Sequence, residues 1–226
     1  VEIAFENKGD FDPQAVGAAI RDAGLECCSV CGAFGPDRDL RGTEARQEAS
    51  KTYIRDSIDA CVALGTDLLV GPLYSAVGRA AMESAAARKA QWKTGGRNLR
   101  EVCAYAEDRG VYLAVEPLNR FETDFLNICA DAGRLVEEVG SPMLKIHLDT
   151  FHMNIEEKSL PLAILSAGDL LYHVHVSEND RYLVIESFTP EVEIIARAAS
   201  IWRETEKSSA DLAGKGLRFL RGLFAE

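Results

Sequence analysis

The sequence has little that would associate it with a membrane or with nucleic acid. No stretch of its 226 residues approaches the roughly 20 uninterrupted apolar residues of a membrane-spanning helix. It shows no signal peptide, so we expect a cytoplasmic protein. Positive charge is scarce, because 25 Lys and Arg residues stand against 36 Asp and Glu residues, for a net charge of −11. Binding to nucleic acid or to an anionic membrane depends on neutralising phosphates, so both kinds of partner are disfavoured.

Cysteine is present, but not in a pattern typical of structural zinc. Cys28 and Cys31 have the spacing of a zinc or redox pair, yet no second Cys pair or Cys/His pair accompanies them. We interpret residues 27–31 as part of a buried strand, and Cys61, Cys103 and Cys129 as members of apolar helix faces. Disulfides are not expected in a cytoplasmic protein.

Strand-like and helix-like segments alternate along nearly the whole chain. The patterns predict seven strands, at residues 1–4, 26–30, 67–71, 111–116, 144–149, 171–175 and 182–186. Helices are predicted from Pro13 onward, with Asp12 as N-cap, and at 43–64, with Val62 on the core face and Gly65 as C-cap. Further helices are predicted at 88–109, 124–139 and 160–166, and at the C-terminal end. Strict alternation predicts a parallel sheet, either open or closed into a barrel. No low-complexity linker and no shift in composition interrupts it, so we predict a single domain over residues 1–226.

Four of these strand-like segments end in a side chain that can bind a metal ion. They are Glu116, Asp149, His175 and Glu186. Any one of them taken alone fits a helix cap, an ion-pair partner or a core residue as well as it fits a metal ligand. Four in succession favour a barrel, since closure of the sheet brings the strand ends around one centre. Three carboxylates and one imidazole make an oxygen-rich site that suits Mn²⁺, Mg²⁺ or Co²⁺ better than a structural zinc ion.

Such a site can bind the adjacent oxygens of a hydroxy-ketone. The metal then stabilises the enediolate that forms when the neighbouring carbon loses its proton. Glu116 and Glu186 come from well-separated strands, so we predict that they act as general acid and base on opposite faces of that carbon. His147 and His173 share the inward face one layer deeper, and we interpret them as hydrogen-bonded filling of the barrel.

The chain departs from an eight-stranded barrel in two places. Only seven strands are predicted, and Val1 begins within a strand-like segment, so we expect the first strand to be missing. Tyr182 starts a strand directly after Arg181, where parallel neighbours need a crossover of a dozen or more residues. We therefore expect a loop and a helix to belong between Arg181 and Tyr182.

The segments around the predicted ligands resemble the D-tagatose 3-epimerase family, which includes D-psicose (D-allulose) and L-ribulose 3-epimerases. The matching motifs are residues 115–122, 147–154, 173–181 and 185–188. The resemblance implies a xylose isomerase-like (β/α)8 TIM barrel. It also implies one divalent metal ion per chain, usually Mn²⁺, held by Glu116, Asp149, His175 and Glu186, and a homo-oligomer, either a dimer or a tetramer.

The same resemblance implies that Glu116 and Glu186 are the acid/base pair at C3 of a free ketose. Glu122, His152 and Arg181 would hold the substrate's C1 to C3 oxygens. Alternatively, Glu122 caps the helix near residue 124, and Arg181 forms a surface ion pair with Asp180 or Glu178. Three further side chains, which also fit a core role, are candidates for the distal end of the sugar site: Cys31, Phe34 and Trp92.

The predicted function is therefore metal-dependent 3-epimerisation of free ketohexoses or ketopentoses, such as D-tagatose/D-sorbose, D-fructose/D-psicose or L-ribulose/L-xylulose. Related barrels with the same site, such as hydroxypyruvate isomerase or inosose dehydratase, are the main alternative. An endonuclease IV-like phosphodiesterase would need more than the four histidines present. A noncatalytic sugar-binding protein would follow if the Arg181–Tyr182 junction is genuine.

Overall fold

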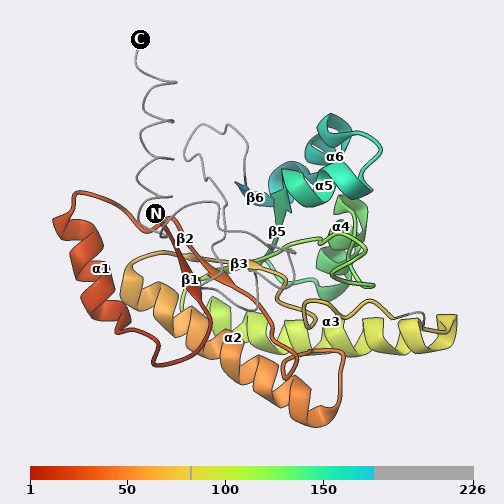
Figure 1. Ribbon diagram of the computed structural model, residues 1–226, viewed down its shortest axis with the longest axis horizontal. Coiled ribbons are helices and arrows are strands. Elements are labelled where there is room, and N and C mark those ends of the chain that lie inside the picture. The colour runs from red at the N-terminus through yellow and green to blue at the C-terminus, as the bar shows by residue number, and fades with distance from the viewer. Residues whose placement is uncertain (82, 176–226) are drawn as a thin grey trace, which may run out of the picture. The chain divides into compact units, whose positions relative to one another are not determined.

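In the computed structural model, residues 1–81 and 83–175 are described, and within them parallel strands alternate with helices (Figure 1). The strands are β1 (Glu2–Phe5), β2 (Ser29–Gly32), β3 (Leu68–Gly71), β4 (Tyr112–Val115), β5 (Leu144–Asp149) and β6 (Leu171–His175). The helices are α1 (Pro13–Asp22), α2 (Glu44–Leu64), α3 (Ala85–Glu107), α4 (Cys129–Val139), α5 (Thr150–Glu156) and α6 (Leu160–Ala167). By its internal contacts the chain divides into Val1–Val184 and Ile185–Glu226, and the second unit lies outside the described residues. The single-domain prediction stays a prediction.

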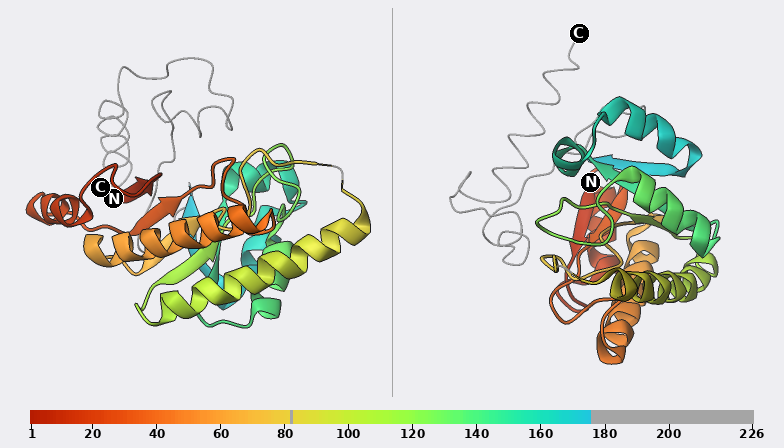
Figure 2. Two further views of the ribbon diagram at one scale, coloured as in Figure 1. Left: turned by 90° about the horizontal axis from the view of Figure 1, so that it is seen from below. Right: turned by 90° about the vertical axis from the view of Figure 1, so that its right-hand side faces the viewer.

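The six strands form one parallel sheet in the order β1-β2-β3-β4-β5-β6. In a flat sheet, five strand spacings of about 4.8 Å would place β1 roughly 24 Å from β6. Instead, Oε1 of Glu2 on β1 lies 3.1 Å from Nε2 of His175 on β6. The sheet is therefore curled into part of a barrel, and these two side chains meet on its inner face. Figure 2 shows α2 and α3 side by side along the outer face.

The helix ends follow the signals in the sequence. The carboxylate of Asp12 accepts from the backbone N–H groups of Gln14 and Ala15, which caps α1, and Pro13 is its first residue. Gly65 ends α2 in the left-handed region at φ 84°, where a side chain would be strained. Both predictions are confirmed. In contrast, the predicted inward position of Val62 is wrong, because that residue is 53% exposed.

Several boundaries differ from the prediction, and one helix was not predicted. Strand β2 begins at Ser29, which pairs with Glu2, rather than at residue 26. Helix α4 begins five residues later than residue 124, because the Asn127 side chain donates to the carbonyls of Leu118 and Thr123 and stabilises a loop. Helix α5 was not predicted, since its N-cap is Asp149, which also ends β5.

The core lies between the sheet and its helices. Its helix residues include Cys61, Cys103 and Cys129, which are all buried, as the apolar interpretation of these cysteines predicts. Among the helices of residues 1–81 and 83–175, none is long and apolar enough to cross a membrane. Polar side chains lie on the inner face of the curled sheet, at the ends of its strands.

Candidate active site

Three of the four predicted metal ligands come together at the carboxyl ends of neighbouring strands. Glu116 directly follows β4, Asp149 ends β5, and His175 ends β6. Each offers a ligand atom within 4.8 Å of the other two. All three are buried, with exposed fractions of 4%, 1% and 1%. The fourth predicted ligand, Glu186, lies outside the described residues, as does Arg181.

The donor set of this group fits a divalent cation. Two buried carboxylates side by side repel each other, and removing them from water is costly. A dication bound between them offsets both effects. Carboxylate oxygens combined with one imidazole nitrogen suit a hard or borderline ion such as Mn²⁺ or Mg²⁺.

His152 lies beside this group and presents a proton to it. Its Nε2 atom is 3.7 Å from Oε1 of Glu116 and 3.7 Å from Oδ2 of Asp149. The backbone N–H of Asn119 donates to Nδ1 of His152 at 3.2 Å, so Nδ1 carries the lone pair. Burial lowers the pKa of His152, which keeps the ring neutral. The remaining ring proton is therefore on Nε2, the nitrogen that faces the carboxylates.

Glu122 is held next to His152 by the side chain of Asn119. The Asn119 Nδ2 atom donates to Oε1 of Glu122 at 2.7 Å and lies 3.0 Å from Nδ1 of His152. Burial raises the pKa of Glu122, although the Asn119 hydrogen bond partly opposes it. The alternative role of Glu122 as a helix cap is wrong, since α4 begins at Cys129 with Ile128 as its N-cap. Asn119 is in a motif that we identified, but its linking role was not predicted.

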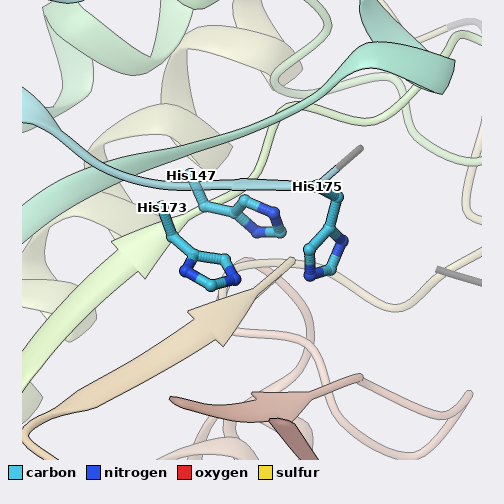
Figure 3. A group of neighbouring side chains, drawn as sticks. All are labelled: His147, His173 and His175. Carbon is cyan, nitrogen blue, oxygen red and sulfur yellow. The ribbon is translucent and has the colours of Figure 1, made fainter. Parts of the chain in front are cut away.

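His147 and His173 lie one layer deeper, as predicted, and with His175 they form a group of three rings (Figure 3). His147 has no exposed surface, and within the described residues neither of its ring nitrogens has a hydrogen-bond partner. The prediction that it is hydrogen-bonded is therefore wrong. Burial lowers its pKa well below the usual range, so the ring is neutral. All four histidines of the sequence belong to this one region.

Glu2 also belongs to the site, and sequence patterns missed it. Its carboxylate lies 3.1 Å from Nε2 of His175 and 3.2 Å from Nε2 of His173, and it accepts from the Ser29 hydroxyl at 2.6 Å. Burial alone would raise the pKa of Glu2, but its contacts with the two histidines outweigh burial and lower the pKa well below its usual range. Glu2 is therefore an ionised carboxylate inside the barrel.

The proposed distal residues behave as packing residues. Phe34 is fully buried in the core, and Cys31 packs against the Leu68, Val70 and Ala114 cluster. Trp92 stacks near Phe125, with its indole N–H donating to Glu138 at 2.6 Å. These contacts favour the core interpretation.

A family model described as a xylose isomerase-like TIM barrel matches residues 1–220, and the chain belongs to this family. Its relatives include an L-ribulose 3-epimerase of Methylomonas sp. (strain DH-1), 31% identical over 194 residues that cover 74% of this chain and 67% of that protein. A ketose 3-epimerase of Arthrobacter globiformis is 29% identical over 248 residues, covering 98% and 84% of the two chains. Among solved structures, a D-allulose 3-epimerase from Methylomonas sp. has a TM-score of 0.83 at 25% identity, and the match covers 98% of this chain and 85% of that one. The predicted fold and the carbohydrate epimerase class are thereby confirmed.

The comparison also bears on the expected missing segment. The alignment with the Arthrobacter enzyme extends over 248 positions, which is more than the 226 residues of this chain. That relative therefore contains residues without a counterpart here. This agrees with a missing crossover, whose predicted place between Arg181 and Tyr182 lies outside the described residues.

Proposed function

We propose that this chain is a metal-dependent ketose 3-epimerase. The observation that carries the proposal is the buried group of Glu116, Asp149 and His175 at three successive strand ends, with the Nε2–H of His152 beside it. The names of its relatives, which are L-ribulose, D-psicose and ketose 3-epimerases, agree with this chemistry.

The metal ligands in this proposal are Glu116, Asp149, His175 and Glu186. Mn²⁺ is the first choice of ion, with Mg²⁺ and Co²⁺ as alternatives. When bound, the ion acts as a Lewis acid that holds adjacent substrate oxygens and stabilises the negative charge released when C3 loses its proton.

Individual side chains carry out the proton transfer and bind the substrate oxygens. Glu116 and Glu186 act on opposite faces of C3, one removing the proton and the other returning a proton from behind, which inverts the carbon. The Nε2–H of His152 donates to a substrate oxygen, and Glu122, held by Asn119, accepts from a substrate hydroxyl. Arg181 donates to the same C1 to C3 region. The substrate is a free ketohexose or ketopentose, such as D-fructose/D-psicose, D-tagatose/D-sorbose or L-ribulose/L-xylulose.

Incubation with these ketoses and Mn²⁺ in D₂O tests the proposal, with NMR following deuterium at C3 and the appearance of the epimer. We expect incorporation at C3 together with epimer formation, and a loss of at least about 10²-fold in Glu116→Gln. Exchange between aldose and ketose without C3 inversion would instead favour the hydroxypyruvate isomerase-like alternative. Binding of ketose with no deuterium uptake would indicate a noncatalytic sugar-binding protein.

Two accompanying predictions concern the whole protein. A homo-oligomer, either a dimer or a tetramer, is expected, and light scattering of the purified chain measures it. A cytoplasmic location also stays a prediction, and fractionation of the source cells tests it.

A further inference from the structure

Arg41 is a buried charged residue in the loop between β2 and α2, and its exposed fraction is 4%. Burying a guanidinium is costly unless its N–H groups have acceptors. Nε and Nη2 of Arg41 donate to the Ser75 hydroxyl at 3.1 and 2.9 Å. Nη1 donates to Oε1 of Gln91 at 3.0 Å. The planar group is therefore held in one orientation by the loop after β3 and by helix α3.

The same guanidinium also contacts the loop between β4 and α4. Its Nη2 atom forms an ion pair with Oδ1 of Asp124 and donates to the Arg79 carbonyl at 3.4 Å. The backbone N–H of Asp124 donates to that same carbonyl at 3.2 Å. Oδ2 of Asp124 accepts from the Ala81 N–H at 3.0 Å. Arg41 therefore lies where the loops after β3 and β4 meet.

Asp39 supports this contact from the loop after β2. Its side chain is fully buried, and it accepts from the backbone N–H of Arg41 at 3.0 Å and from Nη1 of Arg79 at 2.6 Å. Two cations, Arg41 and Arg79, are thus balanced by two carboxylates, Asp39 and Asp124. This network joins three successive loops at the carboxyl end of the sheet, where barrel enzymes bind their substrates.

The network ends beside Glu122, the proposed acceptor for a substrate hydroxyl. The Gly78 N–H donates to the Glu122 carbonyl at 2.7 Å, and Arg79 forms an isolated parallel bridge with Thr123. The backbone of Glu122 is therefore fixed by its own bond to Gly78 and by the ion pair of Asp124, two residues later.

We infer that Arg41 is a positioning residue for substrate binding: its buried guanidinium fixes residues 122–124 against the loop after β3 and so places Glu122. The inference rests on the proposed function, because it concerns the same site. Glu116, Asp149 and His175 end or directly follow their strands, so their places depend on the sheet. Loss of the guanidinium should therefore affect the ketose and spare the metal ion.

Arg41→Lys tests the inference, because lysine keeps the charge but lacks the planar fork that donates in several directions at once. We expect the KM for the ketose to rise about tenfold, as the loss of roughly one hydrogen bond at Glu122 would give. The kcat should change by less than about threefold, because the group acts on binding and not on the proton transfer. The Kd for Mn²⁺ should be unchanged. Steady-state kinetics of the Mn²⁺-loaded full chain and calorimetric titration measure these values.

A double variant distinguishes positioning of Glu122 from a general effect on the fold. Glu122→Ala removes the proposed acceptor, so adding Arg41→Lys to it should raise the KM no further. If the two increases in KM instead multiply, the inference is overturned.

Lys51→Arg is the matched control, because it also exchanges a buried, ion-paired cation for the other type. Lys51 is 7% exposed and pairs with Glu48 and Glu101 at 2.6 and 2.9 Å, but it lies on α2, outside the three loops. It should leave the KM unchanged. An equal rise in KM in Lys51→Arg would mean that any altered buried ion pair has this effect, and it would overturn the inference.

Amide hydrogen exchange of the full chain, followed by NMR, gives a readout that does not depend on catalysis. If Arg41 joins the loops into one unit, the N–H groups of Gly78, Ala81 and Asp124 should be protected to within about tenfold of one another. All three should lose protection together in Arg41→Lys. A wider spread in the wild type, or unchanged protection in the variant, would overturn the inference. The wild-type measurement decides the question even if Arg41→Lys does not fold. If no ketose takes up deuterium at C3, the proposed function fails, whereas the exchange result still tests the role of Arg41.

Discussion

The two edges of the described sheet contribute to the site in different ways. At the β4–β6 edge, one candidate metal ligand ends or directly follows each strand, and the positions of the strand ends bring Glu116, Asp149 and His175 together. At the β1–β2 edge, a single carboxylate, Glu2, reaches across the interior to the opposite edge. The first arrangement depends on which residue stands at the end of each strand. The second depends on how strongly the sheet curls, because the curl brings β1 close to β6.

The largest expected effect is at the β4–β6 edge. Asp149→Asn keeps an oxygen that can cap α5 but removes the negative charge, since Asn and Asp are comparable N-caps. We expect Mn²⁺ affinity to fall by more than about 100-fold, because even the loss of a group that only orients a ligand costs about 10- to 100-fold. Calorimetric titration with Mn²⁺ measures the change.

Asp12→Asn is the matched control for that variant, because Asp12 is also an aspartate N-cap, at the start of α1. It should leave Mn²⁺ affinity unchanged. If both variants bind Mn²⁺ as the wild type does, Asp149 serves only as a cap, and the strand-end group is not a metal centre.

The second prediction concerns how the β1–β2 edge is held. The Tyr53 hydroxyl donates to the Phe5 carbonyl at the end of β1 and accepts from the Ala33 N–H, just after β2, at 3.2 Å. Burial raises the pKa of Tyr53 to about 12, above the usual value of 10.0. Its stabilising contribution is therefore complete below pH 10 and is lost as the pH rises toward 12, by up to about 1.4 kcal/mol per pH unit.

Urea unfolding of the wild type and of Tyr53→Phe between pH 9 and 12 measures this loss. The difference between their free energies of unfolding should shrink across that range, since phenylalanine does not titrate. A difference that stays constant with pH would show that the hydroxyl does not hold this edge.

The two edges also differ in how far the sequence predicts them. Apolar runs that end in charged residues are local patterns, so Glu116, Asp149 and His175 were found from the sequence, as were the caps Asp12 and Gly65. Glu2 sits in a four-residue strand, where one carboxylate looks like an ordinary exposed residue. Its role depends on contacts across 173 residues, which no local pattern reports.

The prediction for the segment after β4 was wrong for another reason. An apolar stripe predicted a helix from residue 124, but side-chain bonds from Asn127 to the backbone stabilise a loop up to Ile128. Such bonds compete with helical ones, and whether they form depends on the packed structure. The same bonds to the Leu118 and Thr123 carbonyls flank Asn119 and Glu122, so the contacts that support these two residues were not predicted either.

The smallest expected effect separates substrate binding from metal binding in this loop. Asn119→Ala removes the donor to Glu122 and the Nδ2 contact with His152, at 2.7 and 3.0 Å. We expect the KM for the ketose to rise about tenfold, as a net loss of roughly 1.4 kcal/mol would give, while the Kd for Mn²⁺ stays within twofold. Asn127→Ala is the control, since its bonds only support the loop, and it should lower the melting temperature with little change in KM. Equal KM values in the two variants would mean that Asn119, like Asn127, supports the fold and not the substrate side of the site.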